Sequence, residues 1–221
     1  MQYRAVLFDF DFTLADASEA ILAGFQHGFS TMGLPDPDPD AVRRTIGIPL
    51  EDAFTLLTGH KDEEERQHFR ALFTEVAAPM QVEVTRLFPG AEELLRALQA
   101  AGIPAALVST KRAQTLRQVL APRGLLPLFA SITGGEMVSR QKPDPEGLLA
   151  AVAALGFTPD QVLYCGDTVI DAETAQRAGA NFCAVLNGTT PASDFAPFPT
   201  AHIAPDLMDL RRWLDLDDSE H

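Results

Sequence analysis

The chain has 221 residues, of which 46% are hydrophobic, and its 31 acidic residues outnumber 17 basic ones to give a formal net charge of −14. This length fits one large α/β domain, or a core domain with a smaller insert, and there are enough apolar residues for a true core. The negative field of the whole molecule disfavours binding to nucleic acid or to an anionic membrane surface, although a local basic pocket could hold a small anion.

The chain begins directly in a strand pattern, with no basic leader and no long apolar stretch. We therefore expect a cytoplasmic protein that is not bound to a membrane. Its two cysteines, Cys165 and Cys183, lie inside apolar runs, which predicts buried free thiols rather than a disulfide or a metal site.

Short apolar runs rich in β-branched residues alternate with amphipathic stretches along most of the chain. The expected strands, in chain order, are "YRAVLFDF", "IPAALVST", "FASITGG", "QVLYCGD", "NFCAVLN" and the weaker "AHIAP". Helical stretches such as "KRAQTLRQVLAPRG" and "DPEGLLAAVAALG" lie between them. This alternation is typical of βαβ units and predicts an α/β fold with a Rossmann-like, doubly wound parallel sheet.

One segment interrupts the alternation directly after the first strand. Between residues 16 and 85 the chain shows helical stretches separated by Pro and Gly, and no convincing strand. Within it, "DPDPDAVRRTIG" predicts a turn with an Asp N-cap, and "DEEERQHFRALFTEVA" predicts a helix with an acidic first turn. We expect a small α-helical cap domain at 16–85 and a core domain formed by 1–15 plus 86–221.

The first strand ends in "VLFDFDFTLAD", where Asp9 and Asp11 are separated by one residue. Side chains two positions apart in a strand point to the same side, so the two carboxylates share one side of the chain. Like charges that close repel each other unless a cation, a shared proton or a reaction requires them. An exposed acidic strand end is the alternative explanation for this stretch alone.

Polar residues also follow two of the next strands. "VSTK" contains Ser109, Thr110 and Lys111, and a hydroxyl there could donate to a phosphate oxygen or cap the following helix. Lys142 lies in the stiff loop "SRQKPDPEGL" and, taken alone, could be a solvated charge. Because ligands of open parallel sheets bind beyond the carboxyl ends of the strands, we expect these residues near Asp9.

The fourth strand runs into "CGDTVIDAETAQRAG", with Asp167 at the strand end and Asp171 four residues later. This spacing puts both acids on one face of a helix start, directed toward the first strand. With Asp9 and Asp11 they form a group of hard oxygen ligands without His or Cys. Such a group suggests Mg²⁺.

These stretches, in this order, resemble the four motifs of the haloacid dehalogenase superfamily, and the match covers essentially the whole chain. "DFDFT" resembles the first motif, "VST" the second, Lys142 in "KPDP" the third and "GDTVIDA" the fourth. The helical insert after the first motif, with its "GIPLEDAFTLLTG", is similar to that of the phosphoglycolate phosphatase subgroup.

The resemblance implies a role for each catalytic residue. Asp9 would be the nucleophile that forms an aspartyl-phosphate, and Asp11 would be the general acid and base. Ser109 and Lys142 would bind the transferring phosphoryl group. A carboxylate surrounded by a cation, a lysine and neutral donors is also what phosphoryl transfer requires chemically.

The same resemblance implies a Mg²⁺ site. Asp167 would bind the ion together with Asp9 and the backbone carbonyl of Asp11. Asp171 would orient Lys142 or a metal-bound water, and it completes the expected metal set.

The function implied is a Mg²⁺-dependent phosphatase for a small phosphorylated metabolite, with phosphoglycolate as the first choice. A phosphomutase of the β-phosphoglucomutase type would share the same core, and a non-catalytic binding module on this fold stays open because a fold does not guarantee activity. A haloalkanoic dehalogenase would need neither a metal nor Asp11. We expect a monomer or a weak homodimer.

One residue departs from the superfamily pattern, which usually has Gly where this chain has Phe12. Gly takes a positive φ at little cost, whereas Phe does not. The backbone after Asp11 must therefore either avoid that conformation or be strained in it.

Overall fold

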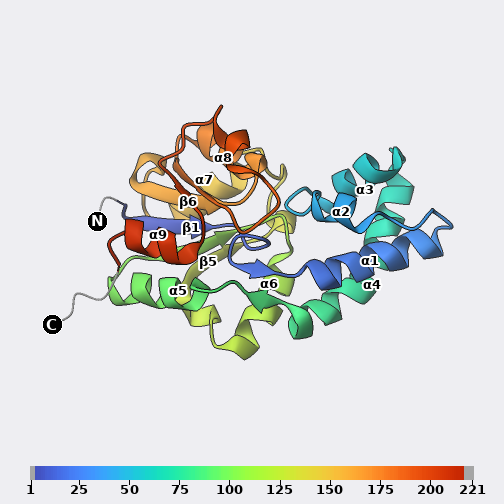
Figure 1. Cartoon of the computed structure of the whole chain (residues 1–221), viewed down its shortest axis with the longest axis horizontal. Coiled ribbons are helices and arrows are strands. Elements are labelled where there is room, and N and C mark those ends of the chain that lie inside the picture. The colour runs from blue at the N-terminus through green and yellow to red at the C-terminus, as the bar shows by residue number, and fades with distance from the viewer. Residues whose placement is uncertain (1–2, 217–221) are drawn as a thin grey trace.

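The computed structural model describes residues 3–216, so the first two and last five residues of the expected core domain lie outside it. Six strands of this part of the chain form one sheet in the order β5-β4-β1-β6-β7-β8, and all neighbouring strands are parallel. In Figure 1 the sheet lies to the left of the helices of residues 18–84. The strands are β1 (Ala5–Phe8), β4 (Ala105–Val108), β5 (Phe129–Thr133), β6 (Val162–Gly166), β7 (Asn181–Val185) and β8 (His202–Ala204). The order extends outward from β1 in both directions, which confirms the predicted doubly wound α/β fold.

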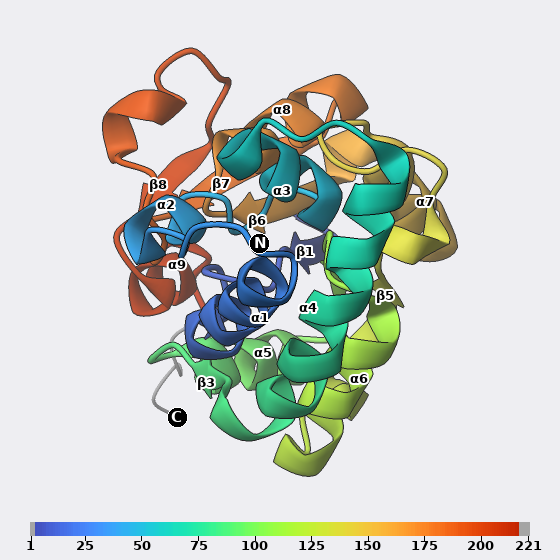
Figure 2. The same ribbon diagram turned by 90° about the vertical axis from the view of Figure 1, so that its right-hand side faces the viewer.

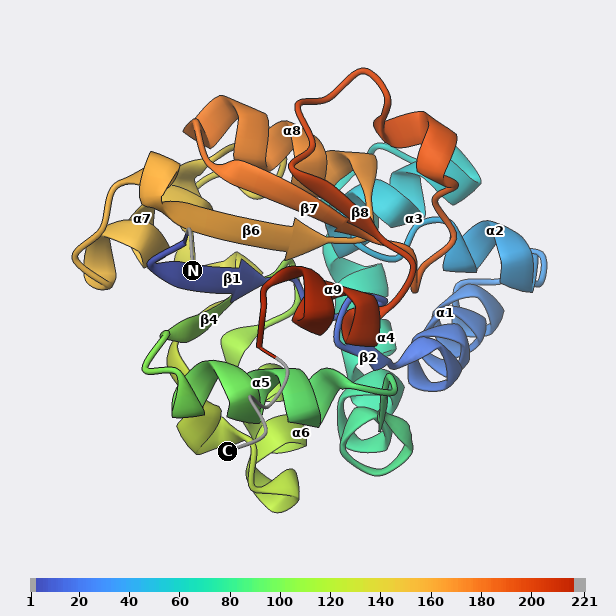
Figure 3. The ribbon, with the colours of Figure 1, turned by 60° about the vertical axis from the view of Figure 1, so that its left-hand side comes forward.

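Helices cover both faces of this sheet (Figure 3). One face carries α5 (Ala91–Ala100), α6 (Ala113–Leu120) and α9 (Leu207–Trp213), and the other carries α7 (Glu146–Ala154) and α8 (Val169–Ala178). Short 3₁₀ helices lie in the connections, at Ala121–Arg123, Leu126–Leu128, Gly135–Met137, Pro159–Gln161 and Ala192–Phe195.

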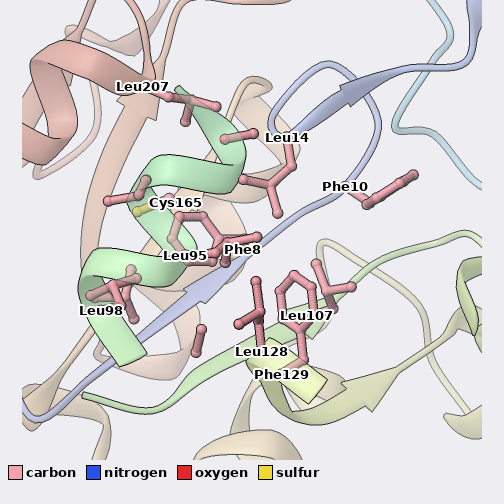
Figure 4. Close-up of a cluster of buried hydrophobic side chains, with 14 of the residues drawn as sticks. Phe8, Phe10, Leu14, Leu95, Leu98, Leu107, Leu128, Phe129, Cys165 and Leu207 are labelled. Carbon is pink, nitrogen blue, oxygen red and sulfur yellow. The ribbon is translucent and has the colours of Figure 1, made fainter. Parts of the chain in front are cut away.

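Successive residues of β1 are buried on opposite faces of the sheet. Val6 and Phe8 belong to the cluster under α5, α6 and α9, whereas Ala5 and Leu7 belong to the cluster under α7 and α8. Figure 4 shows Phe8 beside Leu95 of α5 within the first cluster. Burial on both faces explains why these strands are continuous apolar runs in the sequence.

Residues 18–84 form a separate helical lobe beside the sheet, which we call the cap (Figures 1 and 2). The two-residue strands β2 (Ala15–Asp16) and β3 (Arg86–Leu87) pair antiparallel where the chain enters and leaves it. The helices of the cap are α1 (Ser18–Thr31), α2 (Pro39–Arg43), α3 (Leu50–Thr58) and α4 (Glu63–Val84). Among residues 3–216, no helix has both the length and the apolar character needed to cross a bilayer.

Two aspartates cap the starts of cap helices, the first where the sequence predicts an Asp N-cap and the second at the helix predicted to have an acidic first turn. The side chain of Asp38 accepts a hydrogen bond from the backbone N–H of Asp40 at the start of α2. Asp62 accepts from the N–H groups of Glu64 and Glu65 at the start of α4. These bonds satisfy amide groups that have no partner within the helix.

The interior of the cap is a cluster of phenylalanines between α1, α3 and α4. Phe69 is fully buried, stacks on Phe54 at 4.5 Å between ring centroids and touches Phe25 at 5.1 Å. A β-carbon at Gly28 would lie 2.7 Å from the Phe69 ring, so glycine allows α1 to approach α4 closely. The cap therefore has its own hydrophobic core, apart from the two cores of the sheet.

Candidate active site

The carboxyl ends of β1, β4 and β6 bring the predicted polar residues together. Asp9 follows β1, Ser109 follows β4 and Asp167 follows β6, and these strands are neighbours in the sheet. Asp9 is 1% exposed, Asp167 is 2% exposed and Ser109 is 5% exposed. The structure thus places these side chains at one buried edge, as the strand pattern predicts.

Lys142 reaches this edge from the loop after β5 and is 6% exposed. Its Nζ lies 2.9 Å from Oδ2 of Asp9 and 2.7 Å from Oδ1 of Asp171, and it donates a hydrogen bond to the Tyr164 hydroxyl at 3.1 Å. Burial lowers the pKa of Lys142, but the charges of Asp171 and Asp9 outweigh this effect and raise the pKa above its ordinary value. The ammonium group stays charged beside Asp9.

Asp171 is fully buried at the start of α8 and is held by donors at both carboxylate oxygens. Oδ1 accepts from Lys142 and from the Tyr164 hydroxyl, the latter at 2.9 Å. Oδ2 accepts from the backbone N–H and the hydroxyl of Thr168, at 3.1 and 2.6 Å. A β-carbon at Gly166 would lie 2.4 Å from this side chain, so glycine makes room for it.

Asp9, Asp167 and Asp171 have carboxylate oxygens that lie within 4.8 Å of one another. Burial raises the pKa of Asp9 to about 6, with Asp171 adding to the rise while Lys142 and a hydrogen bond from Ser109 oppose it. The pKa of Asp167 is raised well above its ordinary value by burial, then by the charges of Asp171 and Asp9. Three buried acids facing one lysine are a donor set that fits a hard divalent cation.

The carboxylate of Asp11 lies apart from that triad. Its Oδ1 is 2.9 Å from Nζ of Lys111, and Lys111 donates a hydrogen bond to Oε1 of Gln81 at 2.8 Å. Gln81 belongs to α4 and is 5% exposed, so Lys111 joins the core loop to the cap. The carboxylate of Asp11 is thus not part of the triad and instead contacts Lys111.

The backbone just after Asp11 takes the conformation that Phe resists. Phe12 has φ of +56°, in the left-handed region, and its side chain is 7% exposed. The ring belongs to the hydrophobic cluster of the cap rather than to either core of the sheet. Of the two possibilities expected from the sequence, Phe12 therefore adopts the strained left-handed conformation rather than avoiding it.

Sequence reasoning missed several residues of the site. Tyr164 lies inside a strand pattern, and nothing in that pattern distinguishes it from a packing residue. Thr13 donates from its hydroxyl to Oδ1 of Asp167 at 2.9 Å, and a β-carbon at Gly188 would lie 2.1 Å from Oδ2 of the same acid. Lys111 follows the second expected strand, but its contact with Asp11 was not predicted.

A cavity of about 810 Å³, counting space open to solvent, lies between the cap and the core beside Asp11. Its walls include Lys111 and Thr110 from the core and Gln81 from the cap. The rest of the cap wall is mostly apolar, with Ile21, Phe25, Ile46, Ile48, Leu50, Ala53, Phe73 and Ala78. A mostly apolar wall with a few converging polar groups is typical of sites for small organic ligands.

Comparison with known proteins gives a consistent picture. The family model described as haloacid dehalogenase-like hydrolase matches residues 6–185. A phosphoglycolate phosphatase of Cereibacter sphaeroides is 34% identical over 191 residues, which cover 83% of this chain and 85% of that protein. An N-acetylmuramic acid 6-phosphate phosphatase of Pseudomonas aeruginosa is 33% identical over 193 residues, covering 85% and 84%.

Among solved structures, a haloacid dehalogenase-like hydrolase from Bacteroides fragilis superposes with a TM-score of 0.91 at 38% identity. The match covers 94% of this chain and 99% of that one. The similarities in sequence and in structure therefore both cover most of this chain. The chain belongs to the haloacid dehalogenase-like hydrolase family, in the phosphatase branch that includes phosphoglycolate phosphatases.

Proposed function

We propose that this protein is a Mg²⁺-dependent phosphatase that hydrolyses a small phosphate monoester through a phosphorylated Asp9. The observation that supports it most directly is the buried contact between Oδ2 of Asp9 and the Lys142 ammonium at 2.9 Å. A nucleophile for phosphorus needs a cation at hand for the phosphoryl oxygens, and Lys142 is held in that place by Asp171.

The chain's own residues account for both halves of the reaction. A carboxylate oxygen of Asp9 bonds to phosphorus while the ester P–O bond breaks, and the departing oxygen takes the proton of the Asp11 carboxyl group. Asp11, now a carboxylate, accepts a proton from a water molecule whose oxygen attacks phosphorus and breaks the bond to Asp9. Phosphate leaves, and both aspartates return to their starting states. Ser109 and Lys142 stabilise charge on the phosphoryl group in both steps.

The metal proposal rests on the buried triad of acids. Asp9 and Asp167 would hold Mg²⁺ together with the backbone carbonyl of Asp11, as in the resemblance. Asp171 stands beside them, and its four hydrogen bonds favour its role in orienting Lys142. When bound, Mg²⁺ supplies positive charge to the phosphoryl oxygens and neutralises the excess of buried carboxylates.

Phosphoglycolate is the first substrate to test, because phosphoglycolate phosphatases recur among the relatives. A relative of almost the same identity is named for a much larger ester, N-acetylmuramic acid 6-phosphate. The cavity beside Asp11 lies between cap and core, so it would contact the leaving group of the ester. Esters of graded size belong in the same panel.

We also propose that 16–85 act as a cap domain on a core of 1–15 plus 86–221. The short pair β2 and β3 lies at both crossings, so hinges near residues 14–16 and 83–87 would let the cap open for substrate. Closure would exclude bulk water while Asp9 attacks the phosphorus of the ester. Hydrogen exchange that stays the same with and without a phosphate analogue in both hinges would contradict this division.

Phosphate release from a panel of esters, with Mg²⁺ and with chelator, tests the proposed function. The panel holds phosphoglycolate, N-acetylmuramic acid 6-phosphate and a hexose 1-phosphate. We expect Mg²⁺-dependent release, and a drop in kcat of about 10⁴-fold or more in Asp9→Asn, because that substitution removes the nucleophile. Asp194→Asn, an exposed acid far along the chain, is the matched control and keeps full activity.

Each alternative gives a different result in that panel. Conversion of the hexose 1-phosphate to another hexose phosphate without free phosphate would identify a mutase. Release that is the same in Asp9→Asn would overturn the proposed nucleophile. Absence of turnover on every ester would favour a non-catalytic module.

A further inference from the structure

Asp11 lies between two phenylalanines that belong to different parts of the molecule. Phe10 is fully buried in the core cluster of the sheet, together with Phe8 of β1, and Figure 4 shows it in the loop that leaves this strand. Phe12, two residues later, belongs to the cap cluster with Ile21 and Phe25 of α1. The short stretch that carries the acid is therefore anchored at one end in the core and at the other in the cap.

The anchor on the cap side is the strained one. At φ of +56° the β-carbon and ring of Phe12 crowd the backbone, which a glycine would avoid. The loop is closed by the N–H of Phe12, which donates to the carbonyl of Ala15 at 2.8 Å. Such a conformation persists only when surrounding contacts over-determine it. For Phe12 those contacts include the burial of its ring among the apolar side chains of the cap.

A second connection runs from the cap to the carboxylate itself. Gln81 of α4 accepts a hydrogen bond from Lys111, whose Nζ also lies 2.9 Å from Oδ1 of Asp11. Both the backbone beside Asp11 and the partner of its side chain thus depend on where the cap sits. By contrast, the contacts of Asp9 among residues 3–216 come from the core: its N–H donates to the Cys165 carbonyl, and its Oδ2 lies 2.9 Å from Nζ of Lys142.

We propose that Phe12 is a positioning residue, through which packing of the cap against the first-motif loop sets the orientation of Asp11 and hence proton delivery to the leaving group. This inference rests on the proposed function. It makes acid catalysis depend on the cap contact of one side chain, while the attack by Asp9 does not depend on it. Loss of the ring should therefore harm only those esters whose leaving group needs a proton.

Two esters separate these steps. An alkyl phosphate needs a proton from Asp11 as its oxygen departs, whereas p-nitrophenyl phosphate releases a stable phenolate without one. The quantity to measure is kcat/KM, which covers the steps up to departure of the leaving group. General acid catalysis contributes about 10²–10⁴-fold, so the alkyl ester has a large effect to lose.

Three variants at Phe12 form the test. Phe12→Ala keeps the unfavourable φ and removes the ring, so kcat/KM for the alkyl ester falls about 10- to 100-fold while that for p-nitrophenyl phosphate falls less than about threefold. Phe12→Gly removes both the ring and the strain, so its kcat/KM for the alkyl ester lies between those of Phe12→Ala and the wild type. Phe12→Leu keeps an apolar side chain in the cap cluster and restores most of the alkyl activity.

Phe29→Ala is the matched control. Phe29 is 4% exposed in α1 and belongs to the same cap cluster, but it is not next to a site residue. Its loss lowers the stability of the cap and leaves the ratio of the two kcat/KM values unchanged. If the alanine variants do not fold, Phe12→Leu, Phe12→Gly and Phe29→Leu give the same comparison with a smaller range.

The outcomes keep this inference separate from the proposed function. A selective loss of kcat/KM on the alkyl ester, largest in Phe12→Ala, smaller in Phe12→Gly and smallest in Phe12→Leu, supports Phe12 as the positioning residue. Equal losses on both esters in Phe12→Ala and Phe29→Ala would show a structural role only and overturn the inference, although the wild type remains an Asp9-dependent phosphatase. The alkyl ester is the best substrate of the earlier panel, and a wild type that hydrolyses neither p-nitrophenyl phosphate nor any ester of that panel would overturn the proposed function itself.

Discussion

The core edge and the cap face each other across one cavity, but they are stabilised by different interactions. At the core edge, three buried carboxylates lie close together, and the buried Lys142 contacts two of them, Asp9 and Asp171. In the cap, stacked phenylalanines such as Phe54 and Phe69 form the interior, and ion pairs such as Arg43 with Asp40 lie at the surface. Charge is thus concentrated where the chemistry is proposed, while the cap is stabilised like an ordinary small hydrophobic domain.

This difference has a functional meaning. A buried group of like charges is unfavourable for folding, so it persists where a ligand or a reaction uses it. The mostly apolar side chains of the cap wall carry no such requirement and can vary in shape without altering the nucleophile or its cation. We infer that the core edge determines the reaction and that the cap determines which ester enters. Three substitutions or conditions can break or sharpen this comparison.

Lys142→Met should have the largest effect. It removes the only cation within contact of Asp9 and Asp171 among the described residues and leaves buried carboxylates unbalanced. We expect phosphatase activity to be lost and the free energy of unfolding without metal to fall by about 3–5 kcal/mol at pH 7.5. Urea denaturation followed by circular dichroism measures the second effect.

The same type of change in the cap is the control for Lys142→Met. Arg43→Met removes a cation whose side chain is 45% exposed and pairs with Asp40 at 3.5 Å. Exposed pairs contribute little, so we expect a loss below about 1 kcal/mol. Similar losses in the two variants would show that the core edge does not store unbalanced charge.

Phe69→Ala should affect the cap alone. Its ring is fully buried between Phe54 and Phe25, and removing it leaves a cavity that costs about 3–5 kcal/mol. We expect faster amide hydrogen exchange in residues 18–84 and unchanged exchange in the strands of the sheet. An equal acceleration in both regions would mean that cap and core unfold as one cooperative unit.

Changes of pH and the addition of metal should have the smallest effect on stability, and this effect should arise at the core edge. The pKa of Asp9 is about 6 in the folded protein against 3.8 as its ordinary value. Between these values the folded state binds more protons than the unfolded state, so the metal-free protein loses stability as pH rises from about 4 to 6, by up to about 3 kcal/mol. The raised pKa of Asp167 continues this trend to higher pH.

Mg²⁺ competes with these protons for the carboxylates, so its stabilising effect should grow over the same pH interval. Melting temperatures with and without Mg²⁺ at pH 5 and pH 8 measure it directly. We expect the larger increase at pH 8. An increase of the same size at both values would place the ion away from Asp9 and Asp167.

Much of the fold followed from the sequence because the strands are short, apolar and separated by helices. Burial on both faces makes strands such as Val162–Gly166 continuous apolar runs, and these are visible without tertiary information. The two-residue strands β2 and β3 were not predicted, since two residues carry no periodicity. Their pairing depends on the chain leaving the cap next to where it entered.

For the candidate site, too, some features follow from the sequence and others only from the tertiary structure. The sequence alone determined that Asp9, Ser109, Lys142 and Asp167 would meet, because the carboxyl ends of neighbouring parallel strands share one edge of a sheet. It could not determine that Lys111 would pair with Asp11 and Gln81, since those contacts join elements far apart in the chain. Nor could it decide the conformation of Phe12. Local sterics oppose a positive φ there, and only the tertiary structure shows that the ring is buried in the cap while the backbone keeps it.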